Sequence, residues 1–404
     1  MILVLLSKAL NMWEFLPHQK EKAKQVYQTI KKFGMCYLMG EVRSGKSATA
    51  ILVAEMSKAK NILILTPKGA IKGFQKAIDN LPTTKNYIIT NYEQAHKLKS
   101  NQFDFYIQDE SHRLGTLAKP SQRIKNIRAL CYDKHALLMS GTAIVESPNS
   151  IYHQCCVTKY SPFQHSNFYK FFAEYGVESQ IYLGGRQVKQ YDKYKPHLLN
   201  KIKEFSVIMK QTDAGINLSH NDELHYVELS EQTKKLYNEA LNDSFIQINN
   251  IEHPLESEMA QRVALHQIES GVLKVEDEYH YLGNLEKINY LKNKFKMTDK
   301  TVVLAHYVAE QRLLKEHFPN CTIESATSKA EGVSYAWAEE FIIFSSGYSG
   351  AKFIQRNQRI IDINGSKTLS VHHILVKDSI SEQVYNTCSK KQDFNNQTFQ
   401  RKNL

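Results

Sequence analysis

The stretch GEVRSGKS, residues 40–47, decides the fold. It fits the pattern G-x-x-x-x-G-K-[ST], in which glycines let backbone N–H groups close around phosphate oxygens. The apolar run MCYLM (35–39) precedes it, and the helix-forming segment SATAILVAEMSKA (47–59) overlaps its end. The stretch therefore predicts a phosphate-binding loop between a buried strand and a helix whose positive end points at the phosphates.

Further apolar runs alternate with amphipathic segments after this loop. They are NILILT (61–66), NYIIT (86–90), FDFYIQDE (103–110) and HALLMSGT (135–142). Strands that alternate with helices predict a doubly wound parallel sheet covered by helices. The strand at 103–110 is expected to lie beside the strand that carries the phosphate loop.

The second half of the chain predicts another sheet. Its three expected strands are 301–308, 339–346 and 369–377, and a helical region is expected between 230 and 295. In the irregular segment between the halves, the stretch RQVKQYDKYK (186–195) follows a Gly-Gly turn. We interpret it as an exposed hairpin or loop, with a patch that neutralises nucleic acid phosphates as the alternative.

Composition limits the partners. The 404 residues carry 52 Lys+Arg against 41 Asp+Glu, a net charge of +11, which favours an anionic partner such as nucleic acid or an acidic membrane surface. The apolar opening MILVLLSKAL (1–10) is far shorter than the roughly 20 residues of a spanning helix, so no membrane partner is expected. The six cysteines include no C-x-x-C pair, which favours a reduced cytosolic protein without a structural metal.

The sequence DESH (109–112) supplies the second chemical element. A carboxylate that leaves a neighbouring strand suits a metal ligand, which predicts Asp109 together with the hydroxyl of Ser47 as ligands of Mg²⁺. Glu110 is expected to activate water, and Lys46 to bridge the β- and γ-phosphates of ATP. The other expected nucleotide contacts in the loop are Gly40, Glu41, Val42, Arg43, Ser44 and Gly45. Two acids favour hydrolysis over transfer to a small molecule, whereas the simplest alternative is two acids that end a strand in solvent.

Further short motifs follow in a consistent order. They are LPHQ (16–19), LTPKGAIKGF (65–74), ITNYE (89–93) and SGTAI (140–144). Together with GEVRSGKS and DESH, this series resembles the superfamily-two helicases and translocases, and within them the Swi/Snf-like DNA-dependent ATPases, over most of the chain. The resemblance implies that Gln19 reads the adenine. It implies nucleic acid contacts for Thr66, Lys68 and Thr90, and a role in coupling hydrolysis to movement for His112, Ser140 and Thr142.

The resemblance continues into the second half. AEGVSYAWAEEFIIFSS (330–346) is similar to a glycine-containing motif with Gly332 at its turn, which is also implied in coupling. IQRNQRI (354–360) resembles the arginine motif of the family, so Gln355, Arg356 and Arg359 are implied to reach across the cleft between two lobes towards the γ-phosphate. The chain departs from the family at Asp362, where another arginine is usual. It also lacks the length for a strand–helix unit before Gly332.

The resemblance implies an α/β fold of two RecA-like P-loop lobes, an N-terminal lobe over 1–220 and a minimal C-terminal lobe over 221–404, with ATP and Mg²⁺ in the cleft between them. It implies a monomeric, cytoplasmic motor that translocates along or remodels duplex or branched DNA, in a compact bacterial or bacteriophage form. An RNA helicase and a nucleic-acid-binding module with a weak or vestigial ATPase remain as alternatives. The motif series speaks against a P-loop kinase or transport ATPase.

Overall fold

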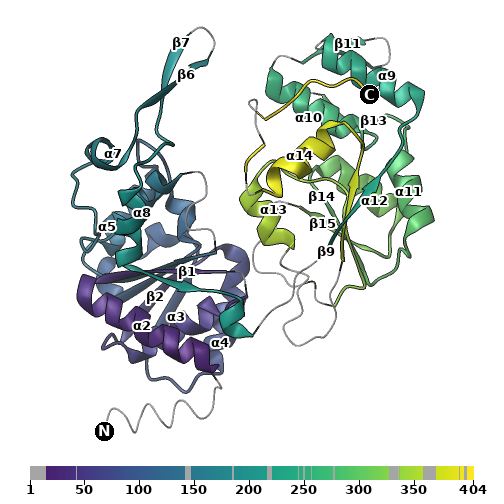
Figure 1. The fold of residues 1–404 in the computed structure, drawn as a ribbon. Helices are drawn as coiled ribbons and strands as arrows, with labels where there is room; N and C mark the ends of the chain where they lie inside the picture. The colour runs from purple at the N-terminus through teal and green to yellow at the C-terminus, as the bar shows by residue number, and fades with distance from the viewer. Residues whose placement is uncertain are drawn as a thin grey trace. The chain divides into compact units, whose positions relative to one another are not determined.

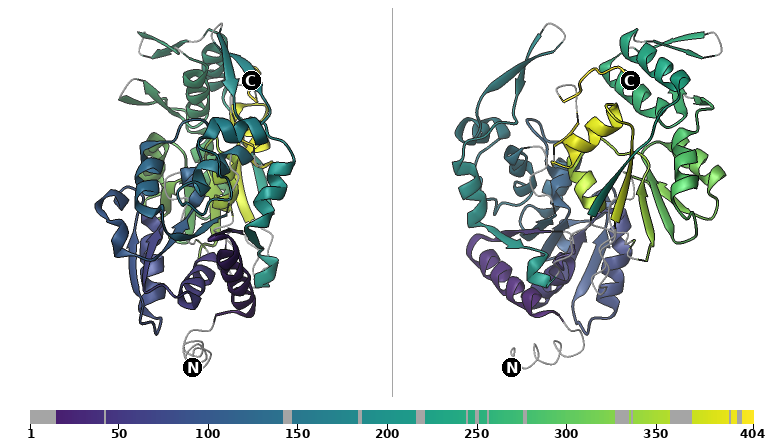
Figure 2. Two further views of the ribbon diagram at one scale, coloured as in Figure 1. Left: turned by 90° about the vertical axis from the view of Figure 1, so that its left-hand side faces the viewer. Right: turned by 45° about the vertical axis from the view of Figure 1, so that its right-hand side comes forward.

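The fold was obtained as a computed structural model (Figure 1). The described residues are 15–41, 43–141, 147–183, 186–215, 221–243, 245–248, 251–255, 257–275, 278–326, 335, 337–357, 370–390, 392–394 and 398–404. The chain divides into two compact units, 1–217 and 218–404. The division predicted from the sequence, at 220/221, falls close to this boundary. Figure 2 gives two further views of the elements of each unit.

A six-stranded parallel sheet forms the centre of the first unit. Its order is β3–β2–β4–β5–β1–β8, with the strands β1 (Met35–Gly40), β2 (Asn61–Leu65), β3 (Asn86–Thr90), β4 (Phe105–Asp109), β5 (His135–Ser140) and β8 (Ser206–Met209). The first five match the apolar runs of the sequence. The edge strand β8 was not predicted, because it lies within the irregular segment.

The prediction that the strand at 103–110 lies beside the phosphate-loop strand is wrong. The strand β5 pairs with both β1 and β4, so it lies between the phosphate loop and the acid pair. Adjacent strands are about 4.8 Å apart, which separates β1 from β4 by roughly 10 Å. The phosphate loop and the acid pair are therefore carried by two strands that are not adjacent in the sheet.

Helices cover both faces of this sheet. They are α2 (Pro17–Phe33), α3 (Lys46–Met56), α4 (Ile71–Asp79), α5 (Gln122–Cys131), α6 (Ile151–Cys155), α7 (Phe168–Tyr175) and α8 (His197–Glu204). Short 3₁₀ helices are η1 (Lys68–Ala70), η2 (Ala95–Lys97), η3 (Ser100–Gln102), η4 (Ser111–Leu114), η5 (Pro148–Ser150) and η6 (Thr212–Ala214). Helices α2, α3 and α4 pack on one face, and α5 to α8 on the other.

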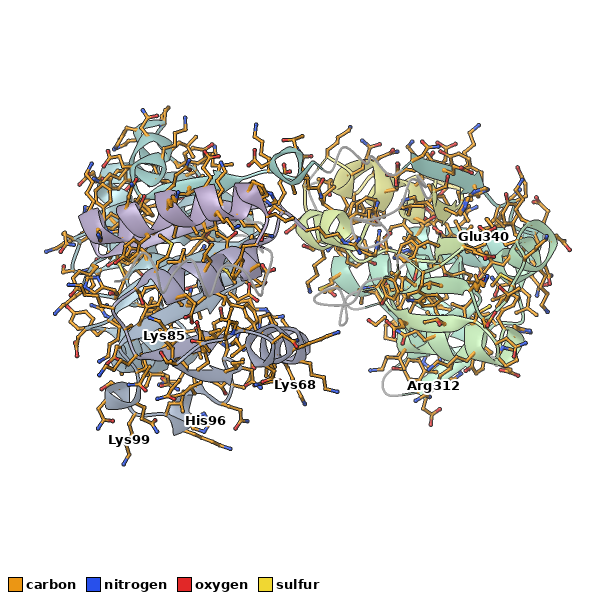
Figure 3. All side chains as sticks on the ribbon, turned by 90° about the horizontal axis from the view of Figure 1, so that it is seen from below. Lys68, Lys85, His96, Lys99, Arg312 and Glu340 are labelled. Carbon is orange, nitrogen blue, oxygen red and sulfur yellow. The ribbon has the colours of Figure 1, made fainter. Side chains whose placement is uncertain are left out.

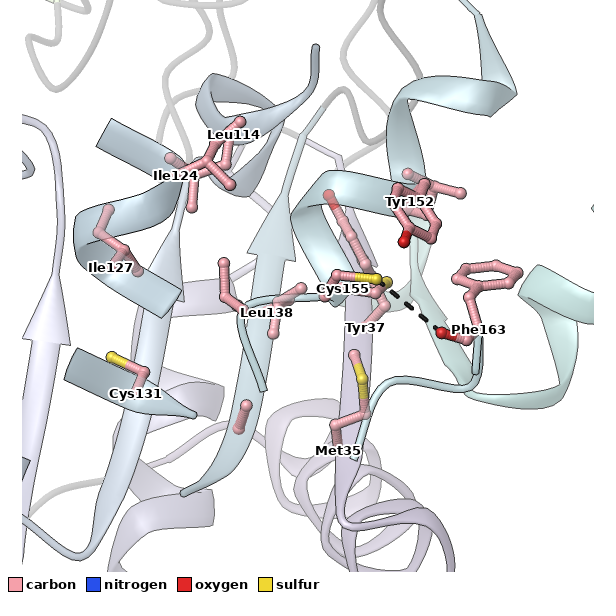
Figure 4. Close-up of a cluster of buried hydrophobic side chains, with 14 of the residues drawn as sticks. Met35, Tyr37, Leu114, Ile124, Ile127, Cys131, Leu138, Tyr152, Cys155 and Phe163 are labelled. Carbon is pink, nitrogen blue, oxygen red and sulfur yellow. Dashed lines mark hydrogen bonds between the residues drawn. The ribbon is translucent and has the colours of Figure 1, made fainter. Parts of the chain in front are cut away.

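Alternate residues of each strand serve the two cores. In β1, Met35 and Tyr37 face the core beneath α5 to α8 (Figure 4). Cys36 and Leu38 face the core beneath α2 to α4. A strand that is buried on both faces needs apolar residues at every position. This double burial explains the unbroken apolar runs by which the sequence predicted these strands.

A hairpin projects from the sheet and helices of the first unit (Figure 1). Its antiparallel strands are β6 (Ser179–Leu183) and β7 (Arg186–Gln190). The hairpin predicted for the basic stretch is therefore confirmed. Lys189 and Lys193 are exposed, whereas Lys195 donates to the carbonyl oxygens of Ala173 and Glu174 at 3.2 and 2.9 Å and so caps the end of α7.

A five-stranded parallel sheet, ordered β15–β14–β16–β17–β9, forms the second unit. Its strands are β9 (Asn221–Tyr226), β14 (Thr301–Ala305), β15 (Thr322–Ser325), β16 (Glu340–Ile343) and β17 (Ser370–Leu375). Its helices are α9 (Glu231–Asn242), α10 (Glu258–Ile268), α11 (Glu286–Lys294), α12 (Val308–His317), α13 (Gly350–Asn357) and α14 (Ile380–Cys388). The three predicted strands are present as β14, β16 and β17, whereas the edge strands β9 and β15 were not predicted.

The sequence predicted a helical region over 230–295, but this region is not helical throughout. Two antiparallel hairpins separate its helices, β10 (Phe245–Ile248) with β11 (Ile251–Pro254), and β12 (Val272–Val275) with β13 (Glu278–Tyr281). Their strands are only four residues long, too short to show a clear alternation. In the described parts of both units, no helix has the length and hydropathy needed to cross a membrane.

Candidate active site

The phosphate loop connects the end of β1 to the start of α3. A Cβ atom on Gly40 would lie 2.4 Å from Cγ of Lys46, so only glycine fits there. Gly45 has a φ of 91°, which favours glycine, and a Cβ atom on it would lie 2.5 Å from the side-chain nitrogen of Gln19. Both glycines of the motif are thus required by the local geometry.

Lys46 is held inside the loop. Its ammonium donates to the carbonyl oxygens of Gly40 and Glu41 at 2.7 and 2.8 Å. Burial lowers the pKa of this ammonium, and the charges of Glu110 and Asp109 act in the opposite direction. A phosphate group would therefore be bound by a lysine that already lies close to both carboxylates.

The other residues predicted to contact the nucleotide or its metal ion lie in the loop or next to it. Ser47 is exposed at the first turn of α3, where a hydroxyl is free to meet a metal ion. Ser44 is buried, and its hydroxyl donates to the carbonyl oxygen of Glu41 at 2.8 Å. Gln19 is also buried, and its side-chain oxygen accepts from the N–H of Leu16 at 3.0 Å. Contact between Gln19 and adenine stays a prediction, and Val42 lies outside the described residues.

Asp109 ends β4 and is buried. The hydroxyl of Thr66, at the end of β2, donates to its carboxylate at 2.7 Å. Burial, together with the charge of Glu110, raises the pKa of Asp109 to about 7. A bound divalent cation would favour the ionised form, which suits the predicted oxygen ligand set of Asp109 and Ser47 for Mg²⁺.

Glu110 follows Asp109 in a left-handed conformation, with a φ of 48°. Its Oε2 accepts from Ser140 at 3.3 Å and lies 3.2 Å from Nδ1 of His112, and this nitrogen is 2.8 Å from the Ser140 hydroxyl. Burial raises the pKa of Glu110, but the hydrogen bonds and charge of His112, with the charge of Lys46 and the Ser140 hydroxyl, lower it overall. Glu110 is thus an anchored carboxylate at neutral pH.

The triangle of Glu110, His112 and Ser140 joins residues that the sequence assigned to different tasks. The base comes from the end of β4, the histidine from η4 and the serine from the end of β5. Because β5 lies between β1 and β4, the Ser140 hydroxyl at its end contacts Glu110, the predicted base. Thr142, the other coupling residue of that motif, lies outside the described residues, as does Gly332.

Two residues that hydrogen-bond to Asp109, Thr66 and Tyr92, have roles that the sequence did not predict. The resemblance implied contact with nucleic acid, but the Thr66 side chain is fully buried and serves Asp109. Tyr92 lies in the motif ITNYE but was given no role; it donates its hydroxyl to the backbone oxygen of Asp109. Its place in that motif, two residues after Thr90, is the signal that could have found it.

Arg356 is a second correction. It was expected to reach out of its unit, but it is 2% exposed and its guanidinium donates to Ser346 at 3.3 Å and lies 4.7 Å from the Phe353 ring centre. Burial lowers the pKa of Arg356 to about 10, and the charge of Asp222 supports the cation. These contacts hold the side chain inside the second unit. Arg359, with the side chain of Gln355, lies outside the described residues, so both roles stay predictions.

Of the remaining nucleic acid candidates, Lys68 is exposed and Thr90 is half-buried. Lys68 begins η1, just after β2, and its side chain extends into solvent (Figure 3). Thr90 ends β3, and its carbonyl oxygen accepts from the N–H of Thr66 at 3.0 Å. Both residues lie at the carboxyl ends of strands, on the same edge as the phosphate loop.

The first parallel sheet carries this loop at its carboxyl edge, and a second parallel sheet between helices follows along the chain. These features place the molecule among P-loop proteins built from two RecA-like lobes. The family model described as "SNF2-related domain" matches residues 19–287. This match covers most of the chain, which therefore belongs to the SNF2-related family.

Two solved structures from Sulfolobus solfataricus are similar to the chain. The SWI2/SNF2 ATPase core in complex with dsDNA has a TM-score of 0.43 and 12% identity, with 94% of this chain and 92% of that chain covered. The SWI2/SNF2 ATPase core domain has a TM-score of 0.42 and 12% identity, with 95% and 90% covered. Among curated proteins, none matches the sequence.

Proposed function

We propose that this chain hydrolyses ATP and uses the hydrolysis to move along or remodel DNA, with duplex or branched DNA as the substrate. The observation that carries the proposal is the grouping of Lys46, Asp109 and Glu110, with Glu110 fixed by a histidine and a serine from neighbouring elements. Membership of the SNF2-related family supports the choice of a nucleic acid motor over other P-loop chemistry.

The proposed hydrolysis divides the chemistry among these residues. Lys46 and the backbone of the loop bind the phosphates, and Glu110 orients and deprotonates the attacking water. In the described residues both hydrogen bonds to the Glu110 carboxylate engage Oε2, so Oε1 is the oxygen that meets the water. Mg²⁺, held by Ser47 and Asp109, would neutralise charge on the phosphate oxygens.

The proposed link between hydrolysis and DNA is the triangle of Glu110, His112 and Ser140. A shift of η4 or of the end of β5 on binding DNA would change the hydrogen bonds to the base directly. A ligand shifts the equilibrium between two conformations only if it binds them with unequal affinity. DNA must therefore bind more tightly to the conformation in which Glu110 is correctly placed. Arg359 from the second lobe is proposed to complete the site.

The proposed DNA contacts are cations on the first lobe. Lys68 lies at the same sheet edge as the phosphate loop, and Lys189 and Lys193 lie on or next to the β6–β7 hairpin. Exposed lysines bind phosphates with release of counterions, so this binding depends on salt and not on base sequence.

Turnover of ATP is expected to rise when duplex or branched DNA is added, and less when single-stranded DNA or RNA is added. The stimulation should fall as salt is raised, because the phosphate contacts are electrostatic. Steady-state ATPase assays with each nucleic acid at matched nucleotide concentration test this prediction. Stronger stimulation by RNA would assign an RNA helicase, and turnover that no nucleic acid changes would assign a vestigial motor.

Mg²⁺ binding in the presence of ATP is expected to strengthen by about tenfold between pH 6 and pH 8. The pKa of Asp109 is raised to about 7, so its carboxylate is mostly protonated at pH 6 and mostly ionised at pH 8. The fold prefers the protonated acid, and stability of the nucleotide-free protein is therefore lost as pH rises from about 4 to about 7.

Mg²⁺ titrations with a fluorescent ATP analogue, and thermal unfolding over the same pH range, measure both effects. In Asp109→Asn the ionisation is removed, so its Mg²⁺ affinity should be low at every pH and its nucleotide-free stability higher than wild type above pH 7. A wild-type Mg²⁺ affinity that does not change between pH 6 and pH 8 would contradict the assignment of Asp109 as the titrating ligand.

A further inference from the structure

Three side chains from two neighbouring strands converge on one face of the second sheet. Glu223 and His225 alternate along β9, and His372 on β17 lies opposite Glu223 in the parallel register. Nε2 of His225 is 3.0 Å from Nδ1 of His372, and Oε2 of Glu223 is 3.4 Å from Nδ1 of His372 and 4.0 Å from Nε2 of His225. Two imidazole nitrogens and a carboxylate oxygen therefore share one small space.

Each of the three side chains is oriented by a further partner. The other ring nitrogen of His225 is 3.0 Å from the Tyr290 hydroxyl, and that of His372 is 3.3 Å from a carboxylate oxygen of Glu340. The second oxygen of Glu223 accepts from the hydroxyl of Ser370 at 2.5 Å. Metal-binding imidazoles in proteins almost always have such outer partners, which fix the ring and its tautomer.

Two of the three separations, 3.0 and 3.4 Å, are close to the edges of a tetrahedral site, and the third, 4.0 Å between Glu223 and His225, is longer. Zinc–nitrogen bonds of 2.0–2.1 Å in a tetrahedron place the ligand atoms about 3.3 Å apart. Burial lowers the pKa of both His225 and His372, so both rings are neutral at pH 7, as metal ligands must be. The hydrogen bond from Ser370 lowers the pKa of Glu223, so its carboxylate is ionised.

The position of the cluster allows an ion to enter. The side chains of His225 and His372 are 11% and 14% exposed, whereas that of Glu223 is 43% exposed. The ring of Phe295 packs against both imidazoles, with ring centres 5.3 and 4.9 Å away. An ion would reach the histidines past Glu223 and keep its fourth position open to water.

We propose that Glu223, His225 and His372 bind one transition-metal ion of the zinc type, with water as the fourth ligand. Two imidazoles and one carboxylate favour Zn²⁺ or Co²⁺ over Mg²⁺ or Ca²⁺, which prefer all-oxygen sites. The ion joins β9, the edge strand that opens the second unit, to β17. Its role is to stabilise the attachment of this edge strand, and it takes no part in the chemistry of ATP.

A hydrogen bond between the two imidazoles accounts for their 3.0 Å contact without an ion, and metal titration separates the two explanations. Metal-free full-length protein, without nucleotide, is titrated with Zn²⁺ against a chromophoric chelator, and with Co²⁺ by visible absorption. We expect one Zn²⁺ per chain, the intense absorption of tetrahedral Co²⁺, and a higher unfolding temperature with Zn²⁺. Weak Co²⁺ absorption of the octahedral type, or less than one Zn²⁺ bound, would overturn the proposal.

Variants locate the ion. His372→Gln should weaken Zn²⁺ binding by at least about a hundredfold, and Glu340→Gln, which removes only an outer partner, by about ten- to hundredfold. His280→Gln, on β13 of the same unit, is the matched control and should bind as wild type. Zn²⁺ binding that is equal in wild type, His372→Gln and Glu340→Gln would place the ion elsewhere, such as at the half-buried Cys321, and overturn the proposal.

Discussion

Replacement of Lys46 with alanine is expected to slow ATP hydrolysis by at least about a hundredfold. Without nucleotide, the Lys46 ammonium is held by two carbonyl oxygens of its own loop, and burial disfavours its charge. Phosphate oxygens replace these carbonyls with negative charge, so the interaction strengthens as charge develops on the phosphate in the transition state. Loss of the ammonium therefore removes stabilisation that is realised mainly during the reaction.

The measurement is steady-state turnover with saturating duplex DNA, accompanied by thermal unfolding to show that the loop variant folds. Lys58→Ala is the matched control, because this exposed lysine lies just beyond the other end of the same helix. Salt-sensitive DNA binding should persist in Lys46→Ala, since the proposed DNA contacts lie elsewhere on the lobe. Wild-type turnover in Lys46→Ala would remove the basis for assigning a phosphate loop.

The sequence predicted the strands that are buried on both faces and missed most of those at the edges. Strands β1, β2, β4 and β5 have apolar residues at nearly every position because each is covered by helices above and below. Strands β8, β9 and β15 lie at sheet edges, where one side of the strand has no neighbour. Polar residues are tolerated there, so a sequence such as NDELHY (221–226) does not read as a strand.

The site was predictable where its residues are close together in the sequence. The lysine, the acid pair and the histidine belong to two short motifs, and each motif contains the strand end that positions it. Contacts between distant segments gave no such signal. Thr66 and Asp109 are 43 residues apart, and His225 and His372 are 147 residues apart. Only the pairing of β2 with β4, and of β17 with β9, brings these residues together.

Arg356 shows a different limit. A motif assigns a residue type to a position, but burial decides whether the side chain is available. The helix α13 turns Arg356 inward, onto Phe353 and Ser346, so the motif leaves Arg359 as the candidate for contact with ATP.

Replacement of Glu110 with glutamine is expected to slow hydrolysis by about 10²–10⁴-fold, with ATP affinity largely unchanged. Glutamine keeps the size of the side chain and an oxygen that can accept from Ser140, but it cannot take a proton from water. Single-turnover hydrolysis and equilibrium binding of a fluorescent ATP analogue separate the two effects. Glu21→Gln, an exposed acid on α2, is the control and should leave both quantities at wild-type values.

The two carboxylates make this prediction specific. The pKa of Asp109 is raised to about 7, whereas that of Glu110 is lowered, so Glu110 is the acid that remains ionised and able to accept a proton as pH falls below 7. Glu110→Gln should therefore lose hydrolysis at every pH, whereas its Mg²⁺ binding should persist and become strong at a lower pH than in wild type, because the charge of Glu110 no longer raises the pKa of Asp109. In Asp109→Asn, the primary loss should be that of Mg²⁺ binding. If Glu110→Gln lost Mg²⁺ binding and Asp109→Asn kept it while losing only hydrolysis, the roles of the two acids would be reversed.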